Sequence, residues 1–261
     1  MKRLLILAAF LLFSHGAWAQ LALDGHASGT SVSSSTVATS TTLTTTNATD
    51  VIIALVTSIT TGAGPPNVSS ISGCSLSWTK RFSRGNTLLA TPDHGNADIW
   101  YATTSGTISS CTVTANLSST NADRSADITV FGISGANTST PFDTNVALTG
   151  SSSSTSTSST PRVFSGLSTN NANDFVFAVT TANTTSGNPG AGYTTIDVAH
   201  VTAGHQDNQY QIFSSTQSGV TVTFGSADQG NGYVILIDAV QQAGGPPPPS
   251  GNFVFVAAPV P

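Results

Sequence analysis

Two aspartates, Asp50 and Asp174, stand in almost the same surroundings, within "NATDVIIALVT" (residues 47–57) and "NANDFVFAVTT" (residues 171–181). Glycosidases use such paired carboxyl groups, one as an acid and one as a carboxylate. The chain contains no Glu, however, and both aspartates follow Asn-Ala-x just before an apolar run. Because Asp and Asn side chains bind nearby backbone amides in turns, the pattern predicts a turn role for both aspartates rather than catalysis.

A serine nucleophile has little support. Hydrolases with a G-x-S-x-G motif place the serine on a strained turn between a strand and a helix, and the nearest match, "GHASG", has Ser28 one position late. Four histidines follow the first twenty residues: His26, His94, His200 and His205. None of them has the i, i+4 spacing of a helical zinc site. The sequence predicts a protein that is not an enzyme, and a hydrolase is the alternative.

Oxygen ligands are grouped in "PDHGNAD", which contains Asp93, Asn96 and Asp98. Hard cations such as calcium bind carboxylate and carbonyl oxygens in loops of this kind. The three residues are therefore candidate ligands of a structural calcium ion, and a metal-free Asp-rich turn is the alternative. No other cofactor is expected.

The elements that position these residues are predicted to be strands. Beyond the first twenty residues, runs such as "ADIWYATTS" and "GYVILIDAV" are rich in β-branched and aromatic residues and are separated by Gly, Asn, Ser and Pro. This pattern is typical of an all-β chain.

The same order of runs occurs twice in the sequence. "ALDG" at Ala22 corresponds to "PFDT" at Pro141, "SWT" at Ser77 to "GYT" at Gly192, and "IWYATTSGT" at Ile99 to "QYQIFSSTQSGV". We interpret the repeat as an internal duplication within residues 20–243, with halves at about 21–135 and 136–243. Eight to ten strands of this kind predict a jelly-roll-like β-sandwich of two packed antiparallel sheets.

Aromatic residues are the best indication of a binding site. Trp78 corresponds to Tyr193 and Trp100 to Tyr210 in the two copies, so these four are expected inside the sandwich. Because side chains alternate between the two faces of a strand, Tyr101 would then point outward. The counterparts of Ile99 and Tyr101 are Gln209 and Gln211, and a ring beside amide groups suits a sugar. Scattered surface polar residues are the alternative.

The same strings carry a resemblance. "VSSISG", "LSWT", "IWYA", "FGISGANTSTPFD", "VFSGL", "NANDFVFA", "GAGYT" and "SSTQSG" resemble a jelly-roll, lectin-like β-sandwich module that recurs in exported bacterial and phage-associated multi-domain proteins. The likeness covers about residues 21–240 and rests on strand openings and turns. It implies an exported β-sandwich and no particular activity.

The first nineteen residues have the form of a secretory signal peptide, with Lys2 and Arg3, an apolar run and "AWA" before Gln20. The mature chain is expected to be secreted, extracellular or at the cell surface. Five basic residues then oppose twelve Asp, a net charge near −7, which argues against nucleic acid as a partner. No later run approaches the roughly 20 apolar residues of a membrane helix, so membrane insertion is not expected.

Cys74 and Cys111 are the two cysteines of the chain. An even number of cysteines in an exported protein favours disulfide pairing. The sequence therefore predicts one disulfide that joins Cys74 to Cys111.

After the repeat the composition changes. "GGPPPPSG" (residues 244–251) is typical of a stiff linker. Residues 252–261, "NFVFVAAPVP", are predicted to be either an added edge strand or, as we favour, the start of a further C-terminal domain.

These features together predict a non-catalytic extracellular binding or adhesion module. Glycans or another cell-surface polymer are the candidate partners. A structural spacer, or a surface or appendage subunit without a ligand, is the alternative.

Overall fold

The computed structural model describes residues 19–31, 36–62, 64–89, 91–119, 125–156, 161–182, 188–201, 204–225 and 232–244. Within these ranges the regular elements are strands β1 to β15, and no helix occurs. Three predicted segments lie outside the described residues: the signal peptide except for its last residue, the linker beyond Gly244, and the C-terminal tail.

Two five-stranded antiparallel sheets form the centre of the molecule. The first large sheet has the order β1 (Ala22–Ser31), β8 (Ser125–Ser134), β3 (Asp50–Thr60), β6 (His94–Thr103) and β5 (Thr79–Leu88). The second large sheet has the order β12 (Thr194–Val201), β13 (Gly204–Phe213), β11 (Asp174–Ala182), β15 (Tyr233–Gln241) and β9 (Gly150–Ser154).

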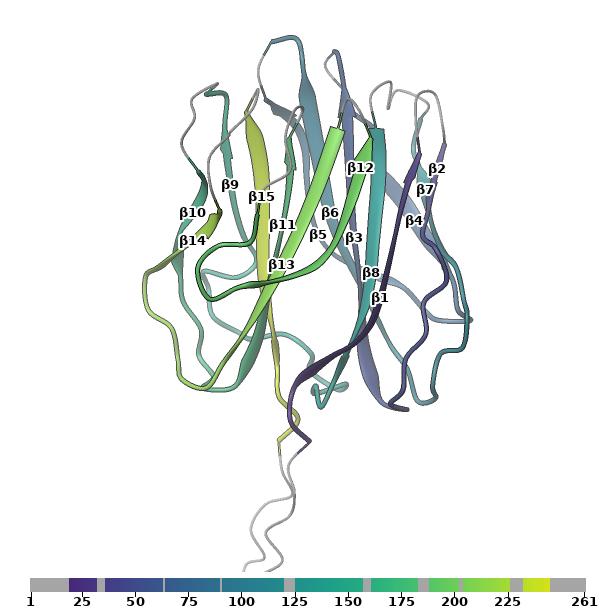
Figure 1. Ribbon diagram of the computed structural model, residues 1–261, viewed down its shortest axis with the longest axis vertical. Helices are drawn as coiled ribbons and strands as arrows, with labels where there is room; N and C mark the ends of the chain where they lie inside the picture. Colours follow the sequence, from purple (N-terminus) through teal and green to yellow (C-terminus); the bar gives the residue numbers. More distant parts are fainter. Residues whose placement is uncertain are drawn as a thin grey trace, which may run out of the picture.

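Two smaller antiparallel sheets complete the fold. The first small sheet consists of β2 (Val37–Thr39), β7 (Val113–Leu117) and β4 (Val68–Gly73). The second small sheet consists of β10 (Arg162–Leu167) and β14 (Val220–Phe224). They lie on opposite sides of the molecule in Figure 1, with the large sheets between them.

Three hydrophobic cores separate these four layers. The inner core joins the two large sheets and contains Phe131 of β8 with Phe175 and Phe177 of β11. The first outer core lies between the first large and first small sheets, and the second outer core between the second large and second small sheets. The prediction of an all-β sandwich is confirmed, but the molecule has four sheets where two were expected, and each half has a core of its own besides the shared one.

The reason for the extra layers lies in the central strands. Every residue of β3, β8 and β11 is buried. A strand with one solvated face alternates apolar and polar residues, whereas a strand covered on both faces has a continuous apolar run. "DVIIALVTSIT" is such a run, and it already indicated a cover on both faces.

The two halves have the same strand order. Read from β1 and from β9, the large sheets run β1-β8-β3-β6-β5 and β9-β15-β11-β13-β12, with the corresponding strands in the same succession along the chain. In the second half β10 takes the place of β2, and a single bridge from Pro189 to Phe224 takes the place of β4 beside β7. Asp50 and Asp174 begin the matching strands β3 and β11, as predicted. A duplication as the origin of this correspondence stays a prediction.

The predicted disulfide is confirmed. Cys74, just after β4, is bonded to Cys111, just before β7, with their Cα atoms 5.4 Å apart. Both side chains are half-buried and pack against the first outer core. The bond therefore joins the end of β4 to the start of the neighbouring strand β7.

Replacing both cysteines with serine should lower the free energy of unfolding. The bond closes a loop of 37 residues, for which the chain-entropy model gives about 4 kcal/mol. Urea unfolding of the wild type and of the Cys74→Ser/Cys111→Ser variant measures the loss. A reducing agent should destabilise only the wild type, and equal midpoints for the two oxidised proteins would contradict the assignment.

Candidate functional site

The residues predicted to bind a sugar do not come together. Tyr101 packs against the inner core, with its ring edge-to-face against Phe142 at a centroid distance of 4.9 Å. Gln209 belongs to the second large sheet and points away from the inner core. There it accepts a hydrogen bond from Gly190 N at 2.8 Å and donates one to Thr223 O at 3.0 Å. Gln211 lies on that face beside Gly192. The expectation of an outward Tyr101 is wrong.

The cause is a shift of one residue between the copies. Ile53 pairs with Tyr101 in the first half, and the matching Phe177 pairs with Tyr210 in the second. Tyr101 therefore corresponds to Tyr210, and Trp100 to Gln209. A slip of one residue moves a side chain to the other face of a sheet. Trp100 is buried in the first outer core, whereas Tyr210, half-buried, stacks on Phe175 in the inner core at 4.6 Å.

The other predicted pair of core aromatic residues is placed consistently. Trp78 packs against the first outer core and Tyr193 against the second, both half-buried. Burial raises the pKa of Tyr193 well above its usual range.

Two of the three candidate calcium ligands do meet. Asn96 and Asp98 are buried on one face of β6, and Asn96 Nδ2 donates to Asp98 Oδ2 at 2.5 Å. The Lys80 ammonium lies 3.6 Å from Asp98 Oδ1 and donates to Val68 O at 2.7 Å. Burial raises the pKa of Asp98, while hydrogen bonds from Ser83 and Asn96 and the charge of Lys80 act against the rise. Lys80 supplies a positive charge beside Asp98.

Asp93 is buried before β6, where its carbonyl oxygen accepts a hydrogen bond from Leu89 N at 2.9 Å. Among the residues that the structure describes, no three His, Cys, Asp or Glu side chains are grouped so as to hold a metal ion. A structural calcium ion at Asp93, Asn96 and Asp98 stays a prediction.

The second half repeats this arrangement with a different cation. Asp98 of β6 pairs with Val56, six residues after Asp50, and Asp207 of β13 pairs with Thr180, six residues after Asp174. Asp207 therefore occupies the position on β13 that Asp98 has on β6. Arg162 Nη1 of β10 lies 2.8 Å from Asp207 Oδ2, and both side chains are buried. Each outer core thus contains one acid–base pair.

A third pair joins the two halves. Arg81 Nε of β5 lies 2.8 Å from Asp238 Oδ2 of β15, and Thr149 Oγ1 donates to the same oxygen at 2.6 Å. Burial raises the pKa of Asp238, and the hydrogen bond and charge of Arg81 oppose this. Next to it, Arg84 donates to Ser151 Oγ at 2.6 Å and Ser153 Oγ at 3.0 Å. These contacts fix one edge of the first large sheet to β9 and β15.

Two further carboxyl pairs lie where the central strands begin. In the first half, Asp24 accepts hydrogen bonds from Thr46 N at 3.0 Å and Asn47 N at 2.7 Å. Burial acts to raise its pKa, but the hydrogen bonds from Thr46 and Asn47 together lower the pKa of Asp24 to about 2. Burial, the charge of Asp24 and a hydrogen bond with it raise the pKa of the adjacent Asp50 to about 7. Asp50 is thus a protonated acid beside a carboxylate at mildly acidic pH.

The second half contains the equivalent pair. Asp143 accepts hydrogen bonds from Asn170 N at 2.8 Å and Asn171 N at 2.9 Å. Burial, the charge of Asp143 and a hydrogen bond with it raise the pKa of the buried Asp174 to about 8. The turn role predicted for Asp50 and Asp174 therefore belongs to Asp24 and Asp143. The sequence contained a signal for this, because "ALDG" and "PFDT" have Asp at the same position of the repeat.

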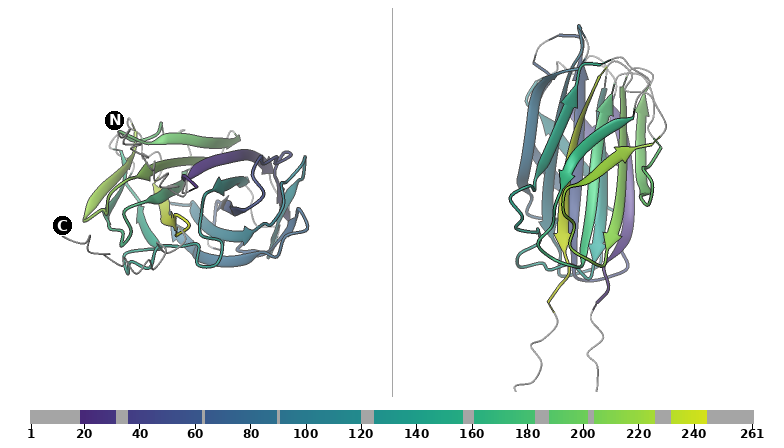
Figure 2. Two further views of the ribbon diagram at one scale, coloured as in Figure 1. Left: turned by 90° about the horizontal axis from the view of Figure 1, so that it is seen from below. Right: turned by 90° about the vertical axis from the view of Figure 1, so that its left-hand side faces the viewer.

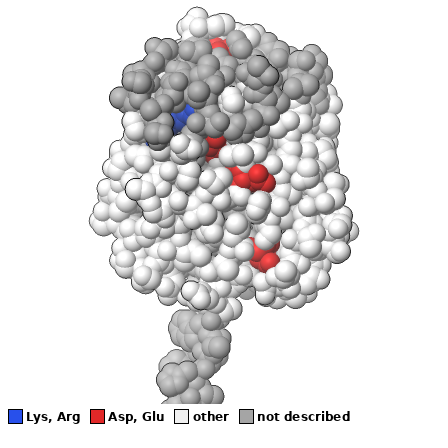
Figure 3. Space-filling model, viewed as in Figure 1, with Lys and Arg blue, Asp and Glu red and all other residues white. Residues whose placement is uncertain are grey.

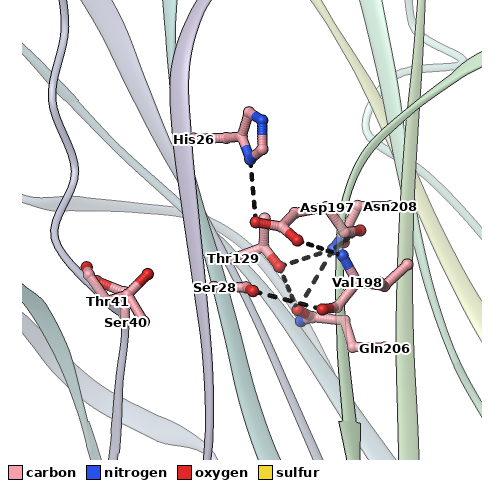
Figure 4. A network of polar contacts seen from close by, with 9 residues as sticks. All are labelled: His26, Ser28, Ser40, Thr41, Thr129, Asp197, Val198, Gln206 and Asn208. Carbon is pink, nitrogen blue, oxygen red and sulfur yellow. Dashed lines mark hydrogen bonds and ion pairs between the residues drawn. The ribbon is translucent and has the colours of Figure 1, made fainter.

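Polar side chains also line the opposite edge, between β1 and β12 (Figure 4). His26 Nδ1 lies 3.0 Å from Asp197 Oδ2. Behind them, buried Asn208 donates to Thr129 Oγ1 at 2.8 Å, and Thr129 donates to Gln206 Oε1 at 2.8 Å. The network links β1 and β8 of the first large sheet to β12 and β13 of the second.

Among the residues that the structure describes, the Asp–His pair at this edge has no serine hydroxyl bonded to the His26 ring. The Ser28 hydroxyl donates to Val198 O at 3.4 Å and not to His26 (Figure 4). A catalytic serine needs its hydroxyl within hydrogen-bond reach of the base. The arrangement accounts for contact between the sheets and supplies no nucleophile.

Comparison with known proteins adds no family. No protein-family model matches the chain, and neither a curated protein nor a solved structure matches it. In the part of the chain that the structure describes, no helix has the length and apolar character needed to cross a membrane.

Replacing Lys80 with methionine should destabilise the protein at neutral pH. Asp98 would keep its burial but lose its cation, and breaking a buried pair costs about 3–5 kcal/mol. Because the Lys80 side chain is 36 % exposed, we expect about 2 kcal/mol. The loss should shrink in acid, where Asp98 is protonated. Urea unfolding at pH 7 and pH 4 tests this. Arg84→Met, which removes only hydrogen bonds to serine hydroxyls, is the control and should cost less.

Replacing Asp50 and Asp174 with asparagine should flatten the pH dependence of stability. Their folded-state pKa values of about 7 and about 8 exceed the ordinary 3.8. Their contribution is therefore complete below the ordinary pKa and is lost as the pH rises through the folded pKa. Asparagine has nearly the same shape as aspartate and cannot ionise. The double variant should be more stable than the wild type at pH 9 by a few kcal/mol. Parallel stability curves in urea from pH 4 to pH 9 would contradict this.

Proposed function

We propose that this protein is a non-catalytic binding module for glycans, active outside the cytoplasm. The observation that carries the proposal is the burial of its charges. Of the ten aspartates that the structure describes, nine are buried, and Asp197 is the exception. On the face seen in Figure 3, the described surface is mostly uncharged, with a few acidic patches and a small basic one.

An uncharged, hydroxyl-rich surface suits a neutral polar ligand. Nucleic acids and anionic lipids need clustered Lys and Arg. The four Lys and Arg side chains of the described residues, however, contact Asp98, Asp238, Asp207 and the hydroxyls of β9. Sugars present neutral hydroxyl groups to which Ser and Thr side chains can donate and from which they can accept hydrogen bonds.

The disulfide supports the location. Disulfides form and persist in secreted and cell-surface proteins and are rare in the cytosol. Cys74 and Cys111 have the geometry of a bonded pair, and the predicted signal peptide points the same way.

A structural spacer is the alternative, and the chain ends argue against an in-line spacer. Gln242 Nε2 donates to Ala19 O at 2.8 Å, and Ala243 N donates to Gly135 O at 2.9 Å. Both ends of the described chain thus leave from one pole (Figures 1 and 2). A spacer in a linear array has its ends at opposite poles.

A glycan array tests the proposal. We expect the oxidised protein to bind a set of neutral glycans, and to keep binding in about 1 M salt, where the Debye length falls to about 3 Å. No glycan binding, together with concentration-dependent assembly, would favour the structural alternative. Turnover in a panel of ester, peptide and glycoside substrates would show an enzyme.

A further inference from the structure

A small open pocket lies beside the disulfide, beyond the ends of β4 and β6 and before β7. Its volume is about 310 Å³, and its lining includes Cys74, Ser75, Thr107, Ile108, Ser109 and Cys111. We refer to it as the disulfide pocket. The volume is at the lower end of the range of ligand sites, roughly 300–1,000 Å³. It therefore has room for a small ligand or for one or two units of a larger one.

The backbone around the disulfide pocket is unusual. Among the described residues, three that are not glycine have a positive φ: Cys74 at 58°, Ser75 at 53° and Ser110 at 48°. All three belong to the pocket or lie between two of its residues. Residues other than glycine keep a positive φ only when the surrounding structure fixes them, and such residues are concentrated at functional sites.

Several bonds fix this backbone. Besides the disulfide, Leu43 and Cys111 exchange backbone hydrogen bonds at 2.7 and 3.0 Å, and Ser110 N donates to Thr44 Oγ1 at 3.1 Å. A ligand that binds here meets a loop already ordered, so that less conformational entropy is lost on binding.

The loop that lines the disulfide pocket is longer than the corresponding loop of the second half. Ile108 N donates to Thr45 Oγ1, and Gln217 N donates to Thr169 Oγ1, each at 3.0 Å. The two loops therefore correspond, with Thr107 in the place of Thr216. The segment from Ile108 to the start of β7 is two residues longer than the corresponding segment from Gln217 to the start of β14. The longer segment contains Cys111. The large sheet does not require the longer loop, since the second half forms a large sheet of the same strand order without it.

The chemistry of the lining selects the ligand. It contains hydroxyl groups, backbone and the disulfide but no charged side chain, and Ser75, Thr107 and Ser109 are exposed. Ile108, which also lines the pocket, is buried and apolar. This combination suits a neutral ring with several hydroxyl groups and one apolar face.

We propose that the disulfide pocket binds one or two sugar units of a neutral glycan. The inference rests on the proposed function and adds to it the place and the charge of the ligand. It also gives the disulfide a second role, as the support of the binding loop.

Filling the pocket tests the assignment. Thr107→Trp should place an indole in the pocket, and the matched control Thr216→Trp adds the same side chain to the corresponding loop of the second half. With the tightest-binding glycan of the array, calorimetric titration should show affinity at least about tenfold weaker for Thr107→Trp and nearly unchanged for Thr216→Trp. The double variant Ser75→Ala/Ser109→Ala, which removes hydroxyls without adding bulk, should also bind more weakly.

The outcomes separate the two proposals. If the wild type binds no glycan, both are overturned. If the wild type binds and all three variants bind equally well, the site lies elsewhere and the proposed function stands. The variants that lose binding should have the same thermal midpoint as the wild type. If the Thr107→Trp protein is unstable, the affinity of the Ser75→Ala/Ser109→Ala variant decides whether the site is the disulfide pocket.

Discussion

Carboxyl groups buried between β-layers are the constraint to which most of this structure responds. A carboxylate taken out of water loses far more solvation energy than any neutral side chain, so that it needs a cation, a proton or several hydrogen-bond donors. This chain uses all three. Lys80, Arg81 and Arg162 lie beside Asp98, Asp238 and Asp207. Backbone amides satisfy Asp24 and Asp143. Asp50 and Asp174, next to those carboxylates, have raised pKa values.

The pairs also connect the layers. Lys80 and Arg162 act within the two outer cores, whereas Arg81 joins β5 of the first large sheet to β15 of the second. His26 and Asp197 meet at the other edge. Polar contacts therefore close both edges of the inner core, and the hydrophobic cores supply the stability between them. Since the cations of the described residues contact buried acids or serine hydroxyls, little positive charge is left on the described part of the surface. The near-neutral exterior is thus a consequence of how the interior is built.

The two halves share a scaffold but differ in one loop. Binding residues are commonly located on loops that a rigid scaffold holds in place. Here the strand order is common to both halves, and the disulfide, the longer loop and the three left-handed residues occur in the first. Such a difference between otherwise equivalent units is where a specific function is expected, since the common features already account for the fold.

By itself the sequence determined the strand class, the disulfide pairing and the matching strand starts at Asp50 and Asp174. These depend on local composition, on the number of cysteines and on a repeat that can be read directly. The tertiary structure alone decided the number of layers, the face of each aromatic residue and the partner of each acid. Tyr101 points inward because its register against Ile53 is fixed by pairing across strands. Asp98 meets Lys80 because a bulge in β5 and the pairing of β5 with β6 bring the two side chains together. Register and long-range pairing are properties of the folded sheets, and a shift of a single residue, nearly invisible in a sequence, reverses what each side chain contacts.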